Sequence, residues 1–327
     1  MNNAIKAEDF KSLFTYWTNP NYGLNWSSVF VIPGFLESWW HVFGNAAAEL
    51  SICSVWQNEE IAGIAPLQIN NSTASFIGNA DVCDYIDFIT VPGKEDFFFG
   101  VLLDALKQKG ISGLDLGPVR PDASVMTSLT GIARKRGYEA TCQKEDVFLE
   151  MVLPATWDEY LGMLGTKQRH ELRRKIRRLA AAGKIDYQVV ASKDSLSPDF
   201  DTFLRLFARS RGHKAAFMTD RMTVFFRTLT LSLTEAGLMR FGILRLPPTV
   251  LAMVMCFDYH GVVYLYNSAY DPDYSHLSPG ILSKAFYIQN SIANNRGKFN
   301  FLKGSEDYKS KMGGEETDIY RCHIAIK

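Results

Sequence analysis

The order of secondary-structure elements expected from the sequence repeats in the two halves of the chain, and this repetition constrains the fold more than any single motif does. In the first half, a helix that begins at Pro33 leads to strand-like runs, a longer helix, a short strand and a helix that ends at Gly137. The strand-like runs cover residues 48–56, 60–69, 74–78 and 85–91, the longer helix 95–109 and the short strand 111–116. An antiparallel meander followed by one helix and one strand is typical of an α+β domain.

The second half is expected to follow the same order. Helices are expected over 157–182, 200–211 and 219–236, strands over 238–246, 249–259 and 262–270, a helix from Ser278, a strand over 298–302, a short helix around Tyr308 and a closing strand over 319–327. We therefore predict an α+β chain of two similar domains, 1–152 and 153–327, each with a mixed, mostly antiparallel sheet flanked by helices.

The composition excludes several classes of protein. The 327 residues include 35 Lys and Arg against 35 Asp and Glu, and 47% are hydrophobic, which excludes a disordered chain and a globally basic nucleic-acid binder. The longest apolar stretch, Val250–Phe257, is shorter than the roughly 20 residues that cross a bilayer, and the N-terminus lacks the layout of a signal peptide. We expect a cytoplasmic protein without a membrane span, and nothing in the sequence indicates its oligomeric state.

The cysteines and the common catalytic motifs give further exclusions. Five cysteines are scattered without a CxxC pair, which indicates neither a disulfide framework nor a zinc site, and we expect no metal. The sequence contains no GxSxG, HExxH, P-loop or GxGxxG motif. Serine hydrolase, zinc peptidase, P-loop and Rossmann functions therefore lack support.

One segment, residues 167–178, is strongly basic. It contains seven Lys and Arg and one acid, a local charge of +6, and its stripe of Leu172, Ile176 and Leu179 predicts a helix that packs on the protein. Such a helix suits a phosphorylated ligand such as a nucleotide-linked sugar, a CoA phosphate or tRNA, because guanidinium groups match phosphate geometry. We expect Lys167, Arg169 and Arg173 to contact this ligand. The alternative is a solvated basic face.

Five segments resemble the CelD-type, Fem-like acetyltransferase family. They are GIAPL, CDYIDF, KQRHELRRKIRRL, YDPDYSHLSPGIL and FLKGSEDYKSKMGGE, which together span nearly the whole chain. The resemblance implies a tandem GNAT-like fold, in which two acyl-CoA N-acyltransferase domains are fused, and the transfer of an acyl or aminoacyl group to an amine. Related Fem ligases take an aminoacyl group from tRNA and add it to a peptidoglycan precursor.

Ser278, Pro279 and Gly280 form the expected start of a helix that follows a strand. A helix N-terminus favours a phosphate, because its backbone N–H groups and its dipole both attract anions. The family resemblance implies that the pyrophosphate of an acyl-CoA donor docks here. The glycine-rich loop usual in GNAT enzymes is absent, so aminoacyl-tRNA or another carrier stays an alternative donor, and an ordinary capped helix is the structural alternative.

The resemblance also implies roles for Tyr308 and Lys309. A Phe-Lys pair precedes a similar GGE in the Fem ligases, and Tyr308-Lys309 corresponds to it. Acyl transfer needs stabilisation of an oxyanion and an acid for the leaving group. We expect Lys309 to supply the positive charge and Tyr308 the acid. The structural alternative is a solvated lysine-rich loop.

Two further groups of residues are candidates for substrate binding. Alternation along the strand places Tyr266, Ser268 and Tyr270 on one face, where they line a cleft or simply pack on the sheet. Asp84, beside Tyr85, is expected to hold or deprotonate the attacking amine, and a solvated turn is the alternative.

These observations predict an N-acyltransferase. It would move an acyl group from an acyl-CoA-type donor to a small or nucleotide-linked amine, such as a nucleotide-linked sugar or a cell-envelope or polysaccharide precursor. The alternatives are a tRNA-dependent aminoacyl transferase of the Fem type and a non-catalytic binding protein with the same fold.

Overall fold

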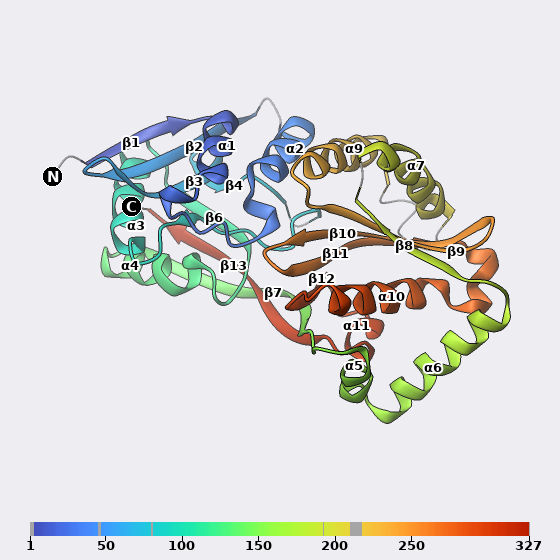
Figure 1. Ribbon diagram of the computed structural model, residues 1–327. Coiled ribbons are helices and arrows are strands. Elements are labelled where there is room, and N and C mark those ends of the chain that lie inside the picture. Colours follow the sequence, from blue (N-terminus) through green and yellow to red (C-terminus); the bar gives the residue numbers. More distant parts are fainter. Residues whose placement is uncertain (1–2, 45–46, 80, 192, 210–217, 327) are drawn as a thin grey trace. The chain divides into compact units, whose positions relative to one another are not determined.

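The computed structural model describes residues 3–44, 47–79, 81–191, 193–209 and 218–326, with the side chains of 193–197 left out. Backbone contacts divide the chain into two compact units (Figure 1). Unit 1 comprises Met1–Val147 and Thr317–Lys327, and unit 2 comprises Phe148–Glu316.

Unit 1 is built on a mixed sheet. Its strands are β1 (Asn3–Glu8), β2 (Ala48–Gln57), β3 (Glu60–Asn70), β4 (Thr73–Phe76), β5 (Ile89–Thr90), β6 (Gly113–Val119), most of β7 (Glu139–Val152) and most of β13 (Glu315–Ala325). Its α-helices are α1 (Phe10–Thr18), α2 (Pro33–Phe43), α3 (Glu95–Gln108) and α4 (Thr130–Lys135). The strands follow the order β1-β2-β3-β4-β6-β13, in which β1 to β4 are antiparallel and β4 pairs in parallel with β6.

Unit 2 has the same kind of sheet. Its helices are α5 (Trp157–Met163), α6 (Thr166–Ala181), α7 (Lys193–Arg209), α9 (Asp220–Glu235), α10 (Pro279–Ala293) and α11 (Asp307–Lys311). Its own strands are β8 (Asp186–Val190), β9 (Met239–Leu246), β10 (Thr249–Tyr259), β11 (Val262–Tyr270) and β12 (Lys298–Lys303). They follow the order β7-β12-β11-β10-β9-β8, and only β11 and β12 are parallel. Figure 1 shows α7 and α9 on one face of this sheet and α10 on the other.

The repeated order expected from the sequence is therefore present, with one exchange of strands. β13 closes the chain but pairs with β6 of unit 1, from Tyr320 opposite Val119 to Ala325 opposite Gly113. The end of β7 pairs in turn with β12 of unit 2. The expected division at residue 152 assigned the closing strand to the second domain, because neither pairing is visible in local sequence patterns.

Two local expectations differ from the structure. The run 85–91 forms a strand only at β5, because the Asp87 side chain accepts hydrogen bonds from the backbone N–H and the hydroxyl of Ser124 (2.7 Å each) and holds the segment before it as a loop. The helical stretch expected over 157–182 consists of two helices, α5 and α6, with Leu164 and Gly165 between them.

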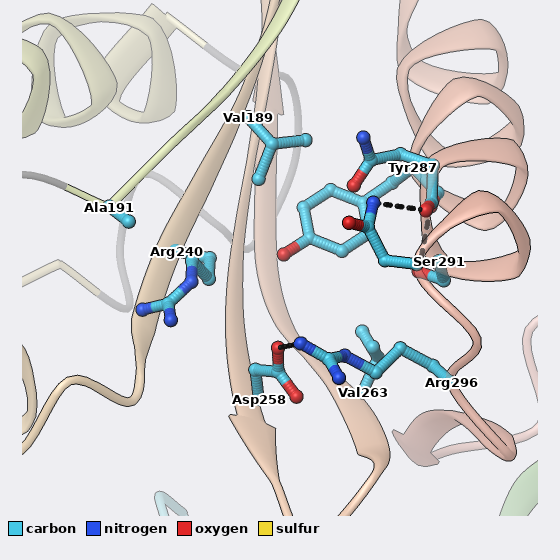
Figure 2. A pocket seen from close by; sticks show the side chains of 10 residues that line it. Val189, Ala191, Arg240, Asp258, Val263, Tyr287, Ser291 and Arg296 are labelled. Carbon is cyan, nitrogen blue, oxygen red and sulfur yellow. Dashed lines mark hydrogen bonds and ion pairs between the residues drawn. The ribbon is translucent and has the colours of Figure 1, made fainter.

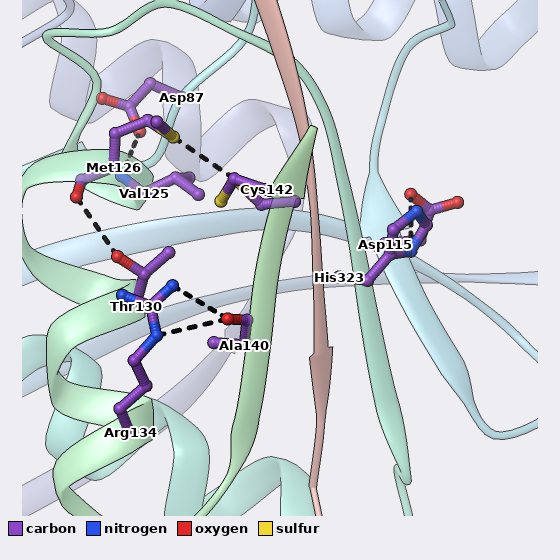
Figure 3. Close-up of a disulfide and its surroundings, with 10 residues drawn as sticks. Asp87, Asp115, Val125, Met126, Thr130, Arg134, Ala140, Cys142 and His323 are labelled. Carbon is purple, nitrogen blue, oxygen red and sulfur yellow. Dashed lines mark hydrogen bonds and ion pairs between the residues drawn. A yellow bond between two sulfur atoms is a disulfide. The ribbon is translucent and has the colours of Figure 1, made fainter. Parts of the chain in front are cut away.

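The sequence also missed a disulfide. Cys142 of β7 and Cys322 of β13 are bonded in unit 1, although 180 residues separate them in the chain (Figure 3). Spacing could not reveal this pair, because it depends on β7 and β13 being neighbours in the sheet. Cys53, Cys83 and Cys256 are free thiols. Within the described ranges, no helix combines the length and the apolar character needed to cross a membrane.

Candidate functional site

The candidate site of unit 2 begins where β11 and β12 diverge. These parallel strands pair at three positions only, from Val262 opposite Lys298 to Tyr264 opposite Asn300. Beyond them, β11 continues alongside β10, and β12 continues alongside β7. We call this divergence the unit 2 fork. The helix α10 connects its two strands and begins beyond the end of β11.

A β-bulge in β11 lies directly after the fork. Cys256 of β10 is opposite Leu265, whereas the preceding Met255 is opposite Asn267, so Tyr266 is the extra residue. The bulge breaks the alternation that placed Tyr266, Ser268 and Tyr270 on one face. The Tyr266 ring packs against the ring of Phe226 in α9, and the two ring centroids are 5.5 Å apart. The helix α9 covers the face of the sheet opposite to α10. The prediction that Tyr266 shares a face with Ser268 and Tyr270 is therefore wrong.

The start of α10 has an unusual cap. Ser278 adopts a left-handed backbone conformation (φ 56°), and its hydroxyl accepts a hydrogen bond from Nη2 of Arg178 in α6 at 2.8 Å instead of capping its own helix. A Cβ on Gly280 would lie 3.1 Å from the Tyr270 ring, so the glycine lets that ring pack against the helix start. The Ser-Pro-Gly sequence therefore joins α10 to both α6 and β11.

Arg178 has a buried donor, its Nε, without a hydrogen-bond partner among the described residues. The guanidinium also lies at the positive end of the α10 dipole, and no acid occupies the first turn of α10. A cation beside a helix N-terminus is unfavourable unless an anion neutralises both. These residues therefore fit a phosphate group, as the sequence predicted for this helix start.

The turn that leads into α10 is held by an ion pair. Arg209 at the end of α7 contacts the carboxylates of Asp271 (2.9 Å) and Asp273 (2.7 Å), and Asp271 also accepts the backbone N–H of Asp273. Asp271 is 6% exposed. Asp271 therefore shapes the turn that leads into α10.

A hollow of about 100 Å³ lies beside the helix start, between α6, α10 and α11. Leu172 and Lys175 of α6, Ile281 of α10, and Tyr308 and Lys311 of α11 are among its lining residues. The Tyr308 ring also contacts the Lys284 ammonium, 4.8 Å from the ring centroid, and Lys284 donates to the Gly280 carbonyl at 2.8 Å. Tyr308 is thereby placed beside the start of α10.

Burial raises the pKa of the Tyr308 hydroxyl well above its usual value, and the nearby Glu306 carboxylate raises it further. The hydroxyl therefore keeps its proton at neutral pH. This protonation state is the one that a proton donor requires.

Lys309 is arranged differently from the expectation. Its side chain is 3% exposed, and its ammonium donates to the carbonyls of Leu302 (3.1 Å) and Gly304 (3.0 Å) and contacts the Glu306 carboxylate at 2.8 Å. The carbonyl of Lys303 accepts a fourth contact. An ammonium has only three hydrogens, so these four acceptors already saturate it. Lys309 holds the loop after β12, and a role at an oxyanion would require it to leave that loop.

The basic helix α6 packs as predicted and keeps exposed charge. Leu172 and Leu179 are buried, while Glu171 pairs with Arg174 (2.8 Å) and Lys175 (3.2 Å). Hydrogen bonds from these two cations lower the Glu171 pKa to about 2. The four other cations of the segment have no ion-pair partner among the described residues: Lys167, Arg169, Arg173 and Arg177. Arg178 of this helix donates a hydrogen bond to Ser278 at the start of α10.

Sequence reasoning missed a polar cluster at the unit 2 fork. Asn300 is fully buried in β12 and donates from Nδ2 to Glu150 of β7 at 3.0 Å, and Lys298 contacts the same carboxylate at 3.1 Å. Asn300 also accepts the backbone N–H of Leu302 and so supports the irregular end of β12. The sequence signal that could have revealed this cluster is Asn300, which stands between apolar residues in the strand KFNFL.

The remaining candidates, Asp84 and Tyr85, lie in unit 1. Tyr85 is only 4% exposed, and its ring packs against Phe30, with ring centroids 5.2 Å apart, and against the Arg120 guanidinium. Tyr85 is therefore a core residue, which does not agree with a role in binding substrate. The role of Asp84 at an acceptor amine stays a prediction.

Residues 166–310 match the family model described as an acetyltransferase (GNAT) domain. The structure of FemX resembles this chain with a TM-score of 0.65 at 10% identity, over 98% of this chain and 96% of that one. A conserved protein of unknown function from Bacteroides thetaiotaomicron gives a TM-score of 0.61 at 12% identity, over 99% and 100%. No curated protein matches the sequence.

At such low identity these structures establish the fold alone, and the fold agrees with the prediction of α+β, tandem GNAT-like domains. The family match covers the basic helix, the unit 2 fork and most of α11. Residues 166–310 are thus similar to a GNAT acetyltransferase domain, in a chain whose fold resembles that of FemX.

Proposed function

We propose that this protein is an N-acyltransferase whose donor binds at the unit 2 fork and the start of α10. The observation that carries this proposal is Arg178, a cation with a buried, unpaired Nε beside a helix N-terminus. An acyl-CoA donor would supply an activated thioester and a pyrophosphate. Arg178 and the first turn of α10 would hold the pyrophosphate, and the divergence of β11 from β12 would leave room for the acyl arm.

The residues around the fork have separate tasks in this proposal. Tyr308, whose hydroxyl stays protonated, would give its proton to the departing sulfur. Lys309 would act as a positioning residue that fixes the loop after β12. The exposed Lys167 and Arg173 and the half-buried Arg169 of α6 would bind a phosphorylated amine acceptor, such as a nucleotide-linked sugar or a cell-envelope precursor.

Calorimetric titration of CoA into the full chain tests the donor site. Arg178→Gln should weaken CoA binding by about tenfold or more, because a charge-assisted hydrogen bond to phosphate is lost. Arg174→Gln is the matched control, since Arg174 lies one turn away on α6 and pairs with Glu171. Equal CoA affinity of Arg178→Gln and the wild type would refute the donor site.

The unpaired cations of α6 favour a second candidate, an aminoacyl transferase that takes its acyl group from tRNA. A tRNA complex should weaken steeply as salt rises, because many phosphate contacts release counterions. Titration of charged tRNA at low and moderate salt, beside the CoA titration, separates the two donors. Tight, salt-sensitive binding of tRNA together with no binding of CoA would favour the second candidate.

The burial of Lys309 favours a third candidate, a binding protein with this fold and no turnover. Mass spectrometry of ligands that co-purify with the chain would identify an anionic ligand directly. Thiol release from acetyl-CoA in the presence of an amine would then separate an enzyme from a binding protein. No release above the spontaneous rate, with CoA bound, would support the binding protein.

A further inference from the structure

Unit 2 contains a second polar pocket at the other end of α10. It lies between the C-terminal half of α10 and the strands β8 to β11, and its volume is about 200 Å³ (Figure 2). Arg240 near the beginning of β9, Asp258 near the end of β10 and Val263 near the beginning of β11 line it. The candidate donor site lies beyond the opposite end of β11, so this pocket is separate from it.

The charges of the pocket do not balance. Arg296 forms an ion pair with Asp258 at 2.7 Å, and the Asp258 side chain is only 14% exposed. Arg240 donates from Nη1 to the carbonyl of Met239 at 2.7 Å, and it has no carboxylate partner among the described residues. Two guanidinium groups therefore face one carboxylate. A partly buried cation without a counter-ion favours the entry of an anion.

A glycine in β9 lets two tyrosine rings pack against the strand beside the pocket. A Cβ on Gly242 would lie 2.4 Å from the Tyr187 hydroxyl and 2.6 Å from the Tyr287 ring, so both rings can lie across the strand only because Gly242 has no side chain. In the view of Figure 2, the Tyr287 ring and Arg240 stand on two sides of the pocket, above the Asp258–Arg296 pair.

Neutral hydrogen-bonding groups complete the lining. Burial raises the pKa of the Tyr287 hydroxyl, which therefore stays protonated, and this hydroxyl hydrogen bonds to the Cys256 thiol. Asn290 and Asn294 add side-chain amides from α10, and Asn294 uses one amide hydrogen on the Asn290 carbonyl at 2.8 Å. A guanidinium and amides line this pocket, and their N–H donors match the acceptors of an oxyanion.

We propose that this pocket binds the carboxylate or phosphate group of a small polar metabolite, with Arg240 as the principal contact. A volume of about 200 Å³ has room for a small anion. The proposal does not depend on acyl transfer, because none of the pocket's residues belongs to the candidate donor site.

Titration of the full chain with inorganic phosphate and, separately, with succinate tests this pocket, with calorimetry as the readout. At least one of the two anions should bind the wild type, and the stronger one tells whether phosphate or carboxylate is preferred. Arg240→Gln should weaken that binding by about tenfold or more. Arg245→Gln is the matched control, because Arg245 lies on the same strand outside the pocket and its loss removes the same charge.

Asp258→Asn provides a second test that does not depend on the folding of Arg240→Gln. Asp258 carries the only carboxylate among the described residues that line the pocket, and its removal should tighten anion binding several-fold, because Arg296 loses its partner. The proposal is overturned if neither anion binds the wild type more tightly than about 10 mM. Arg240→Gln with wild-type affinity, or Asp258→Asn with weaker binding, would overturn it as well.

Discussion

Both units contain the same fork, but the helices that connect its strands begin differently. In unit 1, β4 and β6 pair in parallel from Thr73 opposite Gly113 to Ser75 opposite Asp115, again three positions, and α3 connects them. The first turn of α3 carries two acids, Glu95 and Asp96. The first turn of α10 carries none, and Arg178 of α6 lies against it.

This difference decides which helix start can take an anion. Acids in the first turn of α3 already satisfy the positive end of its dipole and repel a phosphate. At α10, the dipole and the unpaired Nε of Arg178 both favour a phosphate. The two units share a fold, whereas of these two helix starts only that of α10 is suited to an anion, and the acetyltransferase family match lies in the same unit.

The disulfide in unit 1 gives the largest expected effect on stability. Replacement of both Cys142 and Cys322 by Ser should lower the free energy of unfolding by about 4 kcal/mol, because the bond closes a loop of 180 residues. CoA binding should stay unchanged if unit 2 alone carries the donor site. Chemical denaturation with and without a reductant measures the effect, and the reductant should change the wild type only.

The disulfide also bears on the cytoplasmic location expected from the sequence, because disulfides are rare in the cytoplasm. Titration of free thiols in the unfolded, unreduced chain should find three of the five cysteines. Five free thiols in protein taken directly from cells would contradict the disulfide.

Substitution of Lys309 tests how much this residue stabilises the loop that borders the unit 2 fork. Lys309→Met should lower the free energy of unfolding by about 3 kcal/mol, because the buried carbonyls of Leu302 and Gly304 lose their donor. Lys311→Met, two residues along α11, removes an exposed lysine and should leave the melting temperature unchanged. Lys309→Met with full stability and a lower kcat would instead support the oxyanion role.

Local patterns predicted most elements of the fold, because helices and strands leave their own periodicity in the sequence. The exchange of β7 and β13 and the disulfide between them were not predicted, because both depend on contacts between residues far apart in the chain. A single extra residue at the bulge was enough to misplace Tyr266, because every alternation argument assumes an unbroken strand.

The candidate site was predictable in location but less so in detail. The Ser-Pro-Gly helix start and the basic helix were found from composition and spacing. The sequence did not indicate which of the seven cations contacts the helix start, because Arg178 is distinguished only by its contact with Ser278, 100 residues away. Lys309 looked like part of an exposed basic loop, and its burial follows from carbonyls that no sequence pattern marks.

Asp87 gives a pH-dependent test of unit 1. Burial raises its pKa from 3.8 to about 6, although hydrogen bonds from Ser124 and Phe88 oppose the rise. The folded chain therefore keeps a proton that the unfolded chain has lost, and stability should fall by about 2 to 3 kcal/mol as pH rises from about 4 to about 6.

Urea denaturation across this pH range, with Asp87→Asn beside the wild type, measures the effect of Asp87. The variant should lack the fall in stability, and Glu59→Gln, which alters an exposed acid, should retain it. A wild type that becomes more stable than Asp87→Asn as pH rises would show that the hydrogen bonds outweigh burial.

The smallest expected effect comes from the helix starts themselves. Glu95→Gln removes an acid from the first turn of α3 and should lower the free energy of unfolding by about 0.5 kcal/mol, because the acid favours the helix N-terminus. It should leave CoA affinity unchanged. Ile281→Glu makes the opposite change in α10 and should weaken CoA binding, since a carboxylate would then compete with phosphate for Arg178. If Glu95→Gln lowered CoA affinity as much as Ile281→Glu did, anion binding would not be confined to unit 2.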